Sequence, residues 1–187
     1  MSIVDFPGFV TDLKFHAADG GFHYHEDHHC IDITTGRQWW EIQLHPDYDC
    51  DGPLELHIVV DLDPRIQIAF EDEVNKLPED AEWPEEGFDL IVRFHWRLPP
   101  LPNSPNLLEL ATELSAIGGT ALPLHVWAAD TIATVTDDVA RTVHVESERA
   151  VPLAHLVGEH DFLDEPFGLI GTVTRYLHDR APAWLGE

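Results

Sequence analysis

Basic residues are scarce in this chain of 187 residues, in which 10 Lys and Arg face 35 Asp and Glu and the formal net charge is −25. A surface of this sign repels phosphate groups and anionic lipids. We therefore expect neither nucleic acid nor a membrane as a partner. The charge favours basic proteins, metal cations or a saline solvent, and solvation of the surface is an alternative explanation of the acidity.

Cysteine and long apolar runs are scarce as well. The two cysteines, Cys30 and Cys50, do not form a disulfide framework in a chain of this length, and we expect reduced thiols. No apolar run approaches the roughly 20 residues of a membrane span. The residues Met1–Asp5 lack the basic and then apolar pattern of a signal peptide. These absences favour a cytoplasmic protein.

Alternation of apolar and polar residues is the main structural signal of the first hundred residues. It is longest over 54–62 and 88–98, and a hydrophobic content of 44% is enough for a core. Shorter alternations occur over 9–15 and 40–44, and over 66–70 after a turn at Asp63 and Pro64. A period of two with one polar face predicts antiparallel strands that expose one side to solvent. We expect a meander of five or six strands.

A proline-rich connector over 98–105 marks the best internal boundary of the sequence. Apolar residues at helical spacing predict a helix over about 106–117, capped by Asn106, and a second over about 165–179. Further strands are expected between these helices. The sequence therefore predicts an α+β fold, an antiparallel sheet with two main helices. We expect one domain over 1–187, with a possible division into 1–98, mostly strands, and 106–187, mixed helix and strand.

The hexapeptide Asp47–Gly52 has the pattern D-x-D-x-D-G. Carboxylates separated by one residue can converge on a hard cation, and the glycine permits the turn that brings them together. Over about a dozen residues this segment resembles the loop of the EF-hand calcium family, which implies Asp47, Asp49 and Asp51 as calcium ligands. Ile58 stands where that family places its bidentate glutamate. A turn rich in acids between two strands is the alternative.

Histidines cluster between His16 and Gly52. His25–His29 fits H-E-x-x-H, the helical motif in which zinc metallopeptidases hold two ligands and a general base. On a strand, His23 and His25 share one face, as do His28 and Cys30, and either pair can begin a transition-metal site. Solvent-facing histidines without a metal are the alternative. The candidate ligands are His23, His25, His28 and Cys30, completed by His16 or His45.

An acidic segment, residues 71–86, contains eight acids and one lysine, with Pro78 and Pro84 interrupting regular structure. We expect an exposed loop that can bind a basic partner. Trp39 is a further candidate anchor, since one of two adjacent tryptophans on a strand points outward. The candidate partner-binding residues are Glu71, Asp72, Glu73, Glu79, Asp80, Glu82, Glu85, Glu86 and Trp39.

Three classes of function remain open. The sequence favours a non-enzymatic, strongly acidic interaction protein that binds a basic protein, as a chaperone, an inhibitor or the immunity factor of a toxin does. The first alternative is a metal-binding protein, with Ca at the Asp47–Asp51 loop or a transition metal such as Zn at the His23–Cys30 cluster. The second is a metal-dependent hydrolase. The oligomeric state is left open.

Overall fold

The fold is α+β, as predicted, in a computed structural model that describes residues 3–132, 138–157 and 161–187. Over these residues the sheet is six-stranded and antiparallel, in the order β1-β2-β3-β4-β6-β5, so the first four strands form the expected meander. The elements are α1 (Phe6–Asp19), β1 (Phe22–Ile31), β2 (Gln38–Pro46), β3 (Glu55–Leu62), α2 (Pro64–Val74), β4 (Asp89–Arg97), α3 (Leu107–Gly118), β5 (His125–Ile132), β6 (Val139–Pro152) and α4 (Asp164–Leu185), with short 3₁₀ turns η1 (Asp47–Asp49), η2 (Leu153–Leu156) and η3 (Asp161–Leu163).

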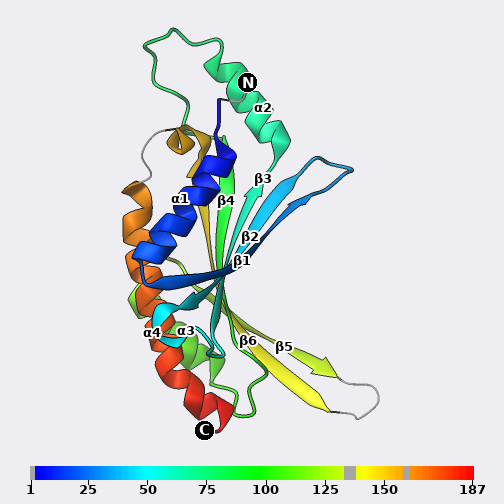
Figure 1. Cartoon of the computed structure of the whole chain (residues 1–187), viewed down its shortest axis with the longest axis vertical. Coiled ribbons are helices and arrows are strands. Elements are labelled where there is room, and N and C mark those ends of the chain that lie inside the picture. The colour runs from blue at the N-terminus through cyan, green and yellow to red at the C-terminus, as the bar shows by residue number, and fades with distance from the viewer. Residues whose placement is uncertain (1–2, 133–137, 158–160) are drawn as a thin grey trace.

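The core lies between the sheet and helices α1 and α4, which cover the same face of the sheet (Figure 1). The alternating apolar residues of β3 and β4 point to this face and are almost completely buried. Phe6 of α1 contacts Trp40 of β2, with ring centroids 4.4 Å apart, and Phe167 of α4 contacts Phe94 of β4 at 6.1 Å. The Trp96 indole donates a buried hydrogen bond of 2.8 Å to Thr174. The opposite face carries the polar residues of the strands.

The strand expected over 9–15 is wrong, because these residues belong to helix α1. The side chain of Asp5 caps the helix by accepting a hydrogen bond from the Gly8 amide, at 3.0 Å. The short alternation hides a longer helical period, in which residues three and four apart share one face. The residues buried on this face are Phe6, Phe9, Val10, Leu13 and Ala17.

The strand expected over 66–70 is also wrong, because the residues that follow Asp63 form helix α2. Asp63 accepts from the Arg65 amide at 2.9 Å, and Pro64 stands in the first turn, where its missing N–H costs no hydrogen bond. A strand would direct Ile68 and Phe70 to the same face. Instead Phe70 is buried and Ile68 is 60% exposed, as helical geometry requires.

The two predicted helices are confirmed as α3 and α4. Asn106 caps α3 as expected, accepting from the amides of Leu108 and Glu109 at 3.0 and 3.3 Å. Helix α4 extends beyond the predicted end and continues through Pro182, in its last turn. Pro182 lacks the N–H that would bond to the carbonyl four residues earlier, and the helix ends three residues after it, at Leu185.

The connector over 98–105 is attached to the elements around it. Leu98 and Leu101 are buried, and the Leu101 amide donates to the Arg141 carbonyl of β6 at 2.9 Å. The Asn103 amide donates to the Trp184 carbonyl of α4 at 3.0 Å. Strand β4, before the connector, pairs with β6, after it. The strands on both sides of the connector therefore belong to one sheet.

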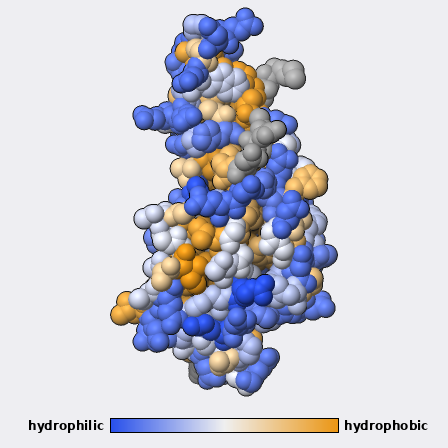
Figure 2. Space-filling model, turned by 90° about the vertical axis from the view of Figure 1, so that its left-hand side faces the viewer, coloured by the Kyte–Doolittle hydropathy of each residue, from blue (hydrophilic) through white to orange (hydrophobic). Residues whose placement is uncertain are grey.

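Hydrophilic residues cover most of the side of the molecule shown in Figure 2, with apolar areas between them. Many of the arginines are paired with acids on or near the sheet, as in the ion pairs of Arg37 with Asp61 and of Arg141 with Asp130, both at 2.7 Å. With 35 acids and 10 basic residues, such pairing leaves a large surplus of carboxylates. Within the described ranges, no helix has the length and apolar character of a membrane span.

Candidate functional site

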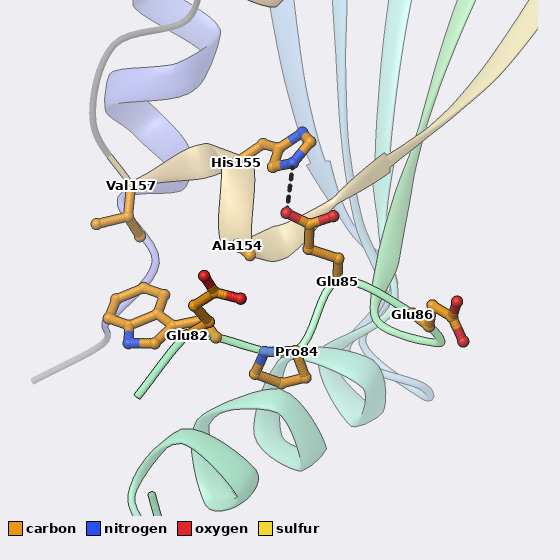
Figure 3. Close-up of a pocket in the computed structure, with 8 residues that line it drawn as sticks. Glu82, Pro84, Glu85, Glu86, Ala154, His155 and Val157 are labelled. Carbon is orange, nitrogen blue, oxygen red and sulfur yellow. Dashed lines mark hydrogen bonds and ion pairs between the residues drawn. The ribbon is translucent and has the colours of Figure 1, made fainter. Parts of the chain in front are cut away.

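A cavity of about 840 Å³ lies between the acidic segment and the 3₁₀ turn η2 (Figure 3). It joins residues of the loop between α2 and β4 to residues that follow β6. The side formed by the acidic segment carries three glutamates, and the side formed by the residues after β6 carries one histidine and two apolar residues. The lining residues are Glu82, Trp83, Pro84, Glu85, Glu86, Ala154, His155 and Val157.

The aromatic residue Trp83 positions the acidic side of this pocket. Its ring lies 5.9 Å from that of Phe70, the buried residue of α2, in an edge-to-face arrangement, and Phe88 contacts Phe70 at 5.7 Å. These contacts anchor the loop on both sides of Glu85 and Glu86, and Glu82 directly precedes the anchored Trp83. In this anchored loop, the side chains of Glu82, Glu85 and Glu86 are exposed to solvent.

The opposite side of the pocket is fixed by the turn η2. Leu153 and Leu156 are buried, and the Leu153 amide donates to the Phe88 carbonyl at 2.8 Å. This bond joins the turn to the end of the acidic loop. Between the two leucines, the ring of His155 faces the carboxylate of Glu85, with Nε2 3.4 Å from Oε1 (Figure 3).

The pocket has a negative electrostatic character. Within the described ranges, Glu82 and Glu86 form no ion pair with a basic residue, and Glu85 has only the His155 ring. Lys76, the one lysine of the acidic segment, is instead paired with Glu73 at 2.7 Å. Carboxylates without a cation partner, in a pocket that an indole also lines, suit an ammonium or guanidinium group.

The structure separates the predicted partner-binding residues into groups. Glu82, Glu85 and Glu86 line the pocket. The remaining acids of the segment lie outside its lining, on α2 or in the loop that follows it. Trp39 lies elsewhere, half-buried on β2 opposite Cys30 of β1. The acids outside the lining are Glu71, Asp72, Glu73, Glu79 and Asp80.

The three carboxylates of the expected calcium loop do not converge. Asp47 and Asp49 belong to the turn η1, and Asp49 is directed to helix α4, where its Oδ2 lies 3.1 Å from His178 Nε2. In the described part of the chain, Asp47, Asp49 and Asp51 are not grouped as possible ligands of one ion. The geometry therefore gives no support to calcium at this loop.

The H-E-x-x-H motif lies on strand β1 and not on a helix, so the spacing that metallopeptidases need is absent. The His29 ring stacks on Trp40, with centroids 3.6 Å apart, whereas His25 contacts the His45 ring at 5.5 Å. The register of β1 with β2 shifts between Tyr24 and Glu26, at the first histidine of the motif. His25 and His29 therefore do not face one ion.

The other candidate ligands are also divided. His28 Nε2 lies 3.6 Å from Glu26 Oε1. Cys30, two residues further along β1, is opposite Trp39 of β2. His16, on α1, is paired with Asp164 at 3.2 Å. Over the described residues, neither His28 nor Cys30 belongs to a group of three possible ligands.

Sequence reasoning missed a polar network on the face of the sheet that α1 and α4 leave uncovered. His57 is only 1% exposed. Its Nδ1 lies 2.7 Å from the Glu41 carboxylate and its Nε2 lies 2.9 Å from that of Glu55. The Arg97 guanidinium donates to Glu41 at 3.2 Å. The hydrogen bond from His57 lowers the pKa of Glu55.

The network continues to strands β4, β6 and β5. His95 Nε2 lies 2.9 Å from His144 Nδ1, and Arg97 Nε lies 3.3 Å from His95 Nδ1. The Trp127 ring stacks on His144 with centroids 3.9 Å apart. Burial is the main cause that lowers the pKa of His95 to about 4, and the Arg97 charge acts in the same direction. These groups satisfy one another, whereas the carboxylates of the pocket face solvent.

No family model, curated protein or solved structure matches the chain. The choice among the three functional classes therefore depends on the geometry of the sites.

Proposed function

We propose that the protein binds a basic partner protein, and that a lysine or arginine side chain of the partner enters the acidic pocket. The observation that carries this proposal is the placement of Glu82, Glu85 and Glu86 around one cavity of about 840 Å³ beside Trp83. Two of these carboxylates have no cation partner in the described part of the chain. A partner cation supplies the missing charge.

The chemistry of the pocket suits such a side chain in two ways. A guanidinium or ammonium group donates charge-assisted hydrogen bonds to the carboxylates, and these are stronger than bonds between neutral groups. Trp83 also lines the pocket, and an indole can make a cation–π contact worth about 0.5–2 kcal/mol. A volume of about 840 Å³ gives room for a whole side chain and not only for one ion.

The charge of the whole molecule assists the encounter. A formal net charge of −25 attracts a basic partner over distances longer than the contact itself. Screening shortens this attraction to about 10 Å at 0.1 M salt. Binding should therefore weaken as salt rises, mainly through a slower association rate. Binding of this kind is what a chaperone, an inhibitor or an immunity factor requires, and it needs no catalytic residues.

The test compares two variants that each lose three acids. The pocket variant carries Glu82→Gln, Glu85→Gln and Glu86→Gln. The control variant carries Asp72→Asn, Glu79→Gln and Asp80→Asn, in the same acidic segment but outside the lining. Both have the same net charge, so a difference between them reports the pocket and not the charge of the molecule.

The measurement is the fluorescence anisotropy of a labelled arginine-rich peptide titrated with each protein. We expect the pocket variant to bind about tenfold more weakly than the unaltered protein, equivalent to about 1.4 kcal/mol. The control variant should lose much less affinity. Equal losses in the two variants, or no binding of the peptide at low salt, would contradict the proposal.

A further inference from the structure

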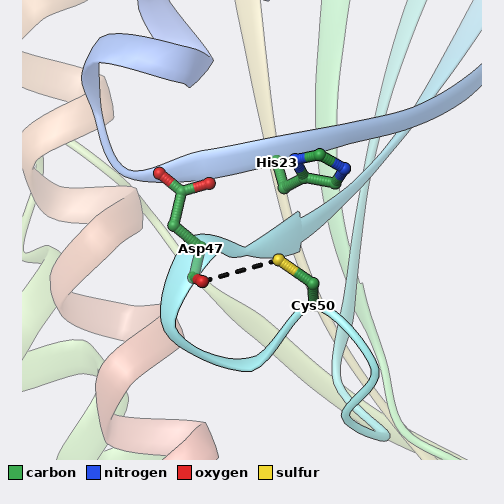
Figure 4. Close-up of side chains that lie close together, drawn as sticks. All are labelled: His23, Asp47 and Cys50. Carbon is green, nitrogen blue, oxygen red and sulfur yellow. Dashed lines mark hydrogen bonds between the residues drawn. The ribbon is translucent and has the colours of Figure 1, made fainter.

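Three possible metal ligands of different chemical types gather away from the acidic pocket. His23, Asp47 and Cys50 each place one ligand atom within 4.8 Å of the others, and all three side chains are exposed (Figure 4). His23 comes from strand β1. Asp47 begins the turn η1, and Cys50 directly follows it. The sequence interpretation assigned His23 and Asp47 to two separate sites and left Cys50 out of both.

The backbone explains why these residues meet. A 3₁₀ helix has 3.0 residues per turn, so residues three apart, such as Asp47 and Cys50, point to the same side. The Cys50 thiol lies 3.5 Å from the Asp47 carbonyl oxygen. The antiparallel pairing of β1 with β2 sets His23 opposite His45, two residues before Asp47. The Asp47 amide donates to the Gly21 carbonyl at 2.9 Å, which joins the turn to the start of β1.

The turn is held from its other side by helix α4. Asp49 contacts His178 at 3.1 Å, and the Tyr48 ring lies edge-on to the His178 ring at 4.9 Å. The Arg175 guanidinium lies over the Tyr48 ring at 4.8 Å. The middle of the turn is thus anchored, while Asp47, its first residue, and Cys50, which follows its last residue, are exposed.

We propose that His23, Asp47 and Cys50 form a binding site for a divalent transition-metal ion, of which Zn²⁺ suits the donors best. Imidazole nitrogen, carboxylate oxygen and thiolate sulfur are the three ligand types that zinc accepts, at about 2.0–2.3 Å. In a tetrahedral complex, ligands at these distances are about 3.3–3.8 Å apart. Small rotations of exposed side chains bring atoms that lie within 4.8 Å to this spacing.

The donor set also determines which ions are excluded. A thiolate is a soft ligand that Ca²⁺ and Mg²⁺ do not favour, and the single carboxylate of this group offers too few oxygens for calcium. Three protein ligands leave a fourth tetrahedral position for water or an exogenous ligand. Because the thiol of Cys50 must lose its proton to bind the ion, metal binding releases a proton and strengthens as pH rises.

The experiment uses the full chain prepared without an affinity tag. Zn²⁺ is titrated against a chromogenic chelator of known affinity, and Co²⁺ is titrated as a spectroscopic substitute, because a thiolate ligand gives a charge-transfer absorption in the near ultraviolet. Cys50→Ser and Asp47→Asn are compared with the matched controls Cys30→Ser and Asp51→Asn. Each control removes the same type of side chain from a residue outside the cluster. Circular dichroism establishes that every variant is folded.

We expect one Zn²⁺ per chain, a thiolate–cobalt absorption that Cys50→Ser abolishes and Cys30→Ser retains, and at least a tenfold loss of zinc affinity in both cluster variants. The proposal is overturned if the unaltered chain binds no zinc at micromolar concentration. It is also overturned if the controls lose as much affinity as the cluster variants, which would indicate adventitious binding by exposed acids and histidines. The glutamine variant of the acidic pocket should bind zinc unchanged, so the two proposals fail independently.

Discussion

Protonation of His95 should destabilise the folded protein as pH falls. The ring nitrogens of His95 lie 2.9 Å from His144 and 3.3 Å from Arg97, so the neutral ring accepts a hydrogen bond at Nδ1 and donates one at Nε2. Burial lowers its pKa from 6.5 to about 4, assisted by Arg97, His144 and His57 and opposed by Glu41. An added proton would place a positive charge beside the Arg97 guanidinium.

The sign and size of the effect follow from linkage. The unfolded chain, in which the pKa of His95 is about 6.5, binds the proton more readily than the folded protein, in which it is about 4. The contribution of His95 to stability is therefore complete above pH 6.5 and decreases as pH falls towards 4. Between about pH 7.5 and pH 5, the free energy of unfolding should fall by about 2 kcal/mol on account of this residue.

The assay is urea unfolding of the unaltered protein and of His95→Gln at these two pH values. Glutamine retains a donor and an acceptor but does not titrate in this range. Carboxyl groups whose pKa is lowered in the folded state, such as those of Asp27 and Glu55, add an acid-dependent loss to both proteins. The variant should therefore lose about 2 kcal/mol less than the unaltered protein over the same interval. An identical loss in the two proteins would refute the reasoning.

Two further outcomes concern the stability of the fold. Thr174→Val leaves the buried Trp96 indole N–H without its acceptor, which lies at 2.8 Å, and should lower the free energy of unfolding by about 1–3 kcal/mol in urea titrations. Thr172→Val is the matched control, since Thr172 is exposed on the same helix and its hydroxyl donates to the Gly168 carbonyl, its one hydrogen bond to a side chain or carbonyl of the described residues. An equal loss of stability in this variant would contradict the explanation. Added NaCl, in a buffer that contains a metal chelator, should raise the melting temperature measured by scanning calorimetry. The reason is that the chain has 35 acidic and 10 basic residues, so that its surplus carboxylates repel one another and salt screens this repulsion. A flat or falling response would show that this repulsion does not limit stability.

The sequence predicts best those elements whose pattern is long. Strands β3 and β4 alternate over many residues, and helix α3 has both a cap at Asn106 and a regular apolar stripe. Helices α1 and α2 were mistaken for strands because a few apolar residues fit either period over a short window. In α2, the burial of Phe70 and the exposure of Ile68 distinguish the two interpretations, as does the cap at Asp63.

The sites are less predictable because they depend on contacts between distant segments. The density of acids in the sequence identifies the segment over 71–86. Only the folded structure, however, shows that Glu82, Glu85 and Glu86 share a cavity with residues after β6. His23 and Cys50 meet only through the register of β1 with β2 and the turn that follows. His57 similarly belongs to the polar face that alternation predicts. Its partner Glu41, and Arg97, which donates to Glu41, are brought to it by the pairing of neighbouring strands.

The most direct test of partner binding at the acidic pocket follows Trp83 itself. The six tryptophans can be labelled as 5-fluorotryptophan, with Trp83→Phe used to assign one fluorine resonance and Trp127→Phe another. On titration with the arginine-rich peptide, the Trp83 resonance should shift and reach saturation with the dissociation constant that anisotropy gives, while the Trp127 resonance stays in place. A peptide that binds and leaves the Trp83 resonance unmoved would contradict the account.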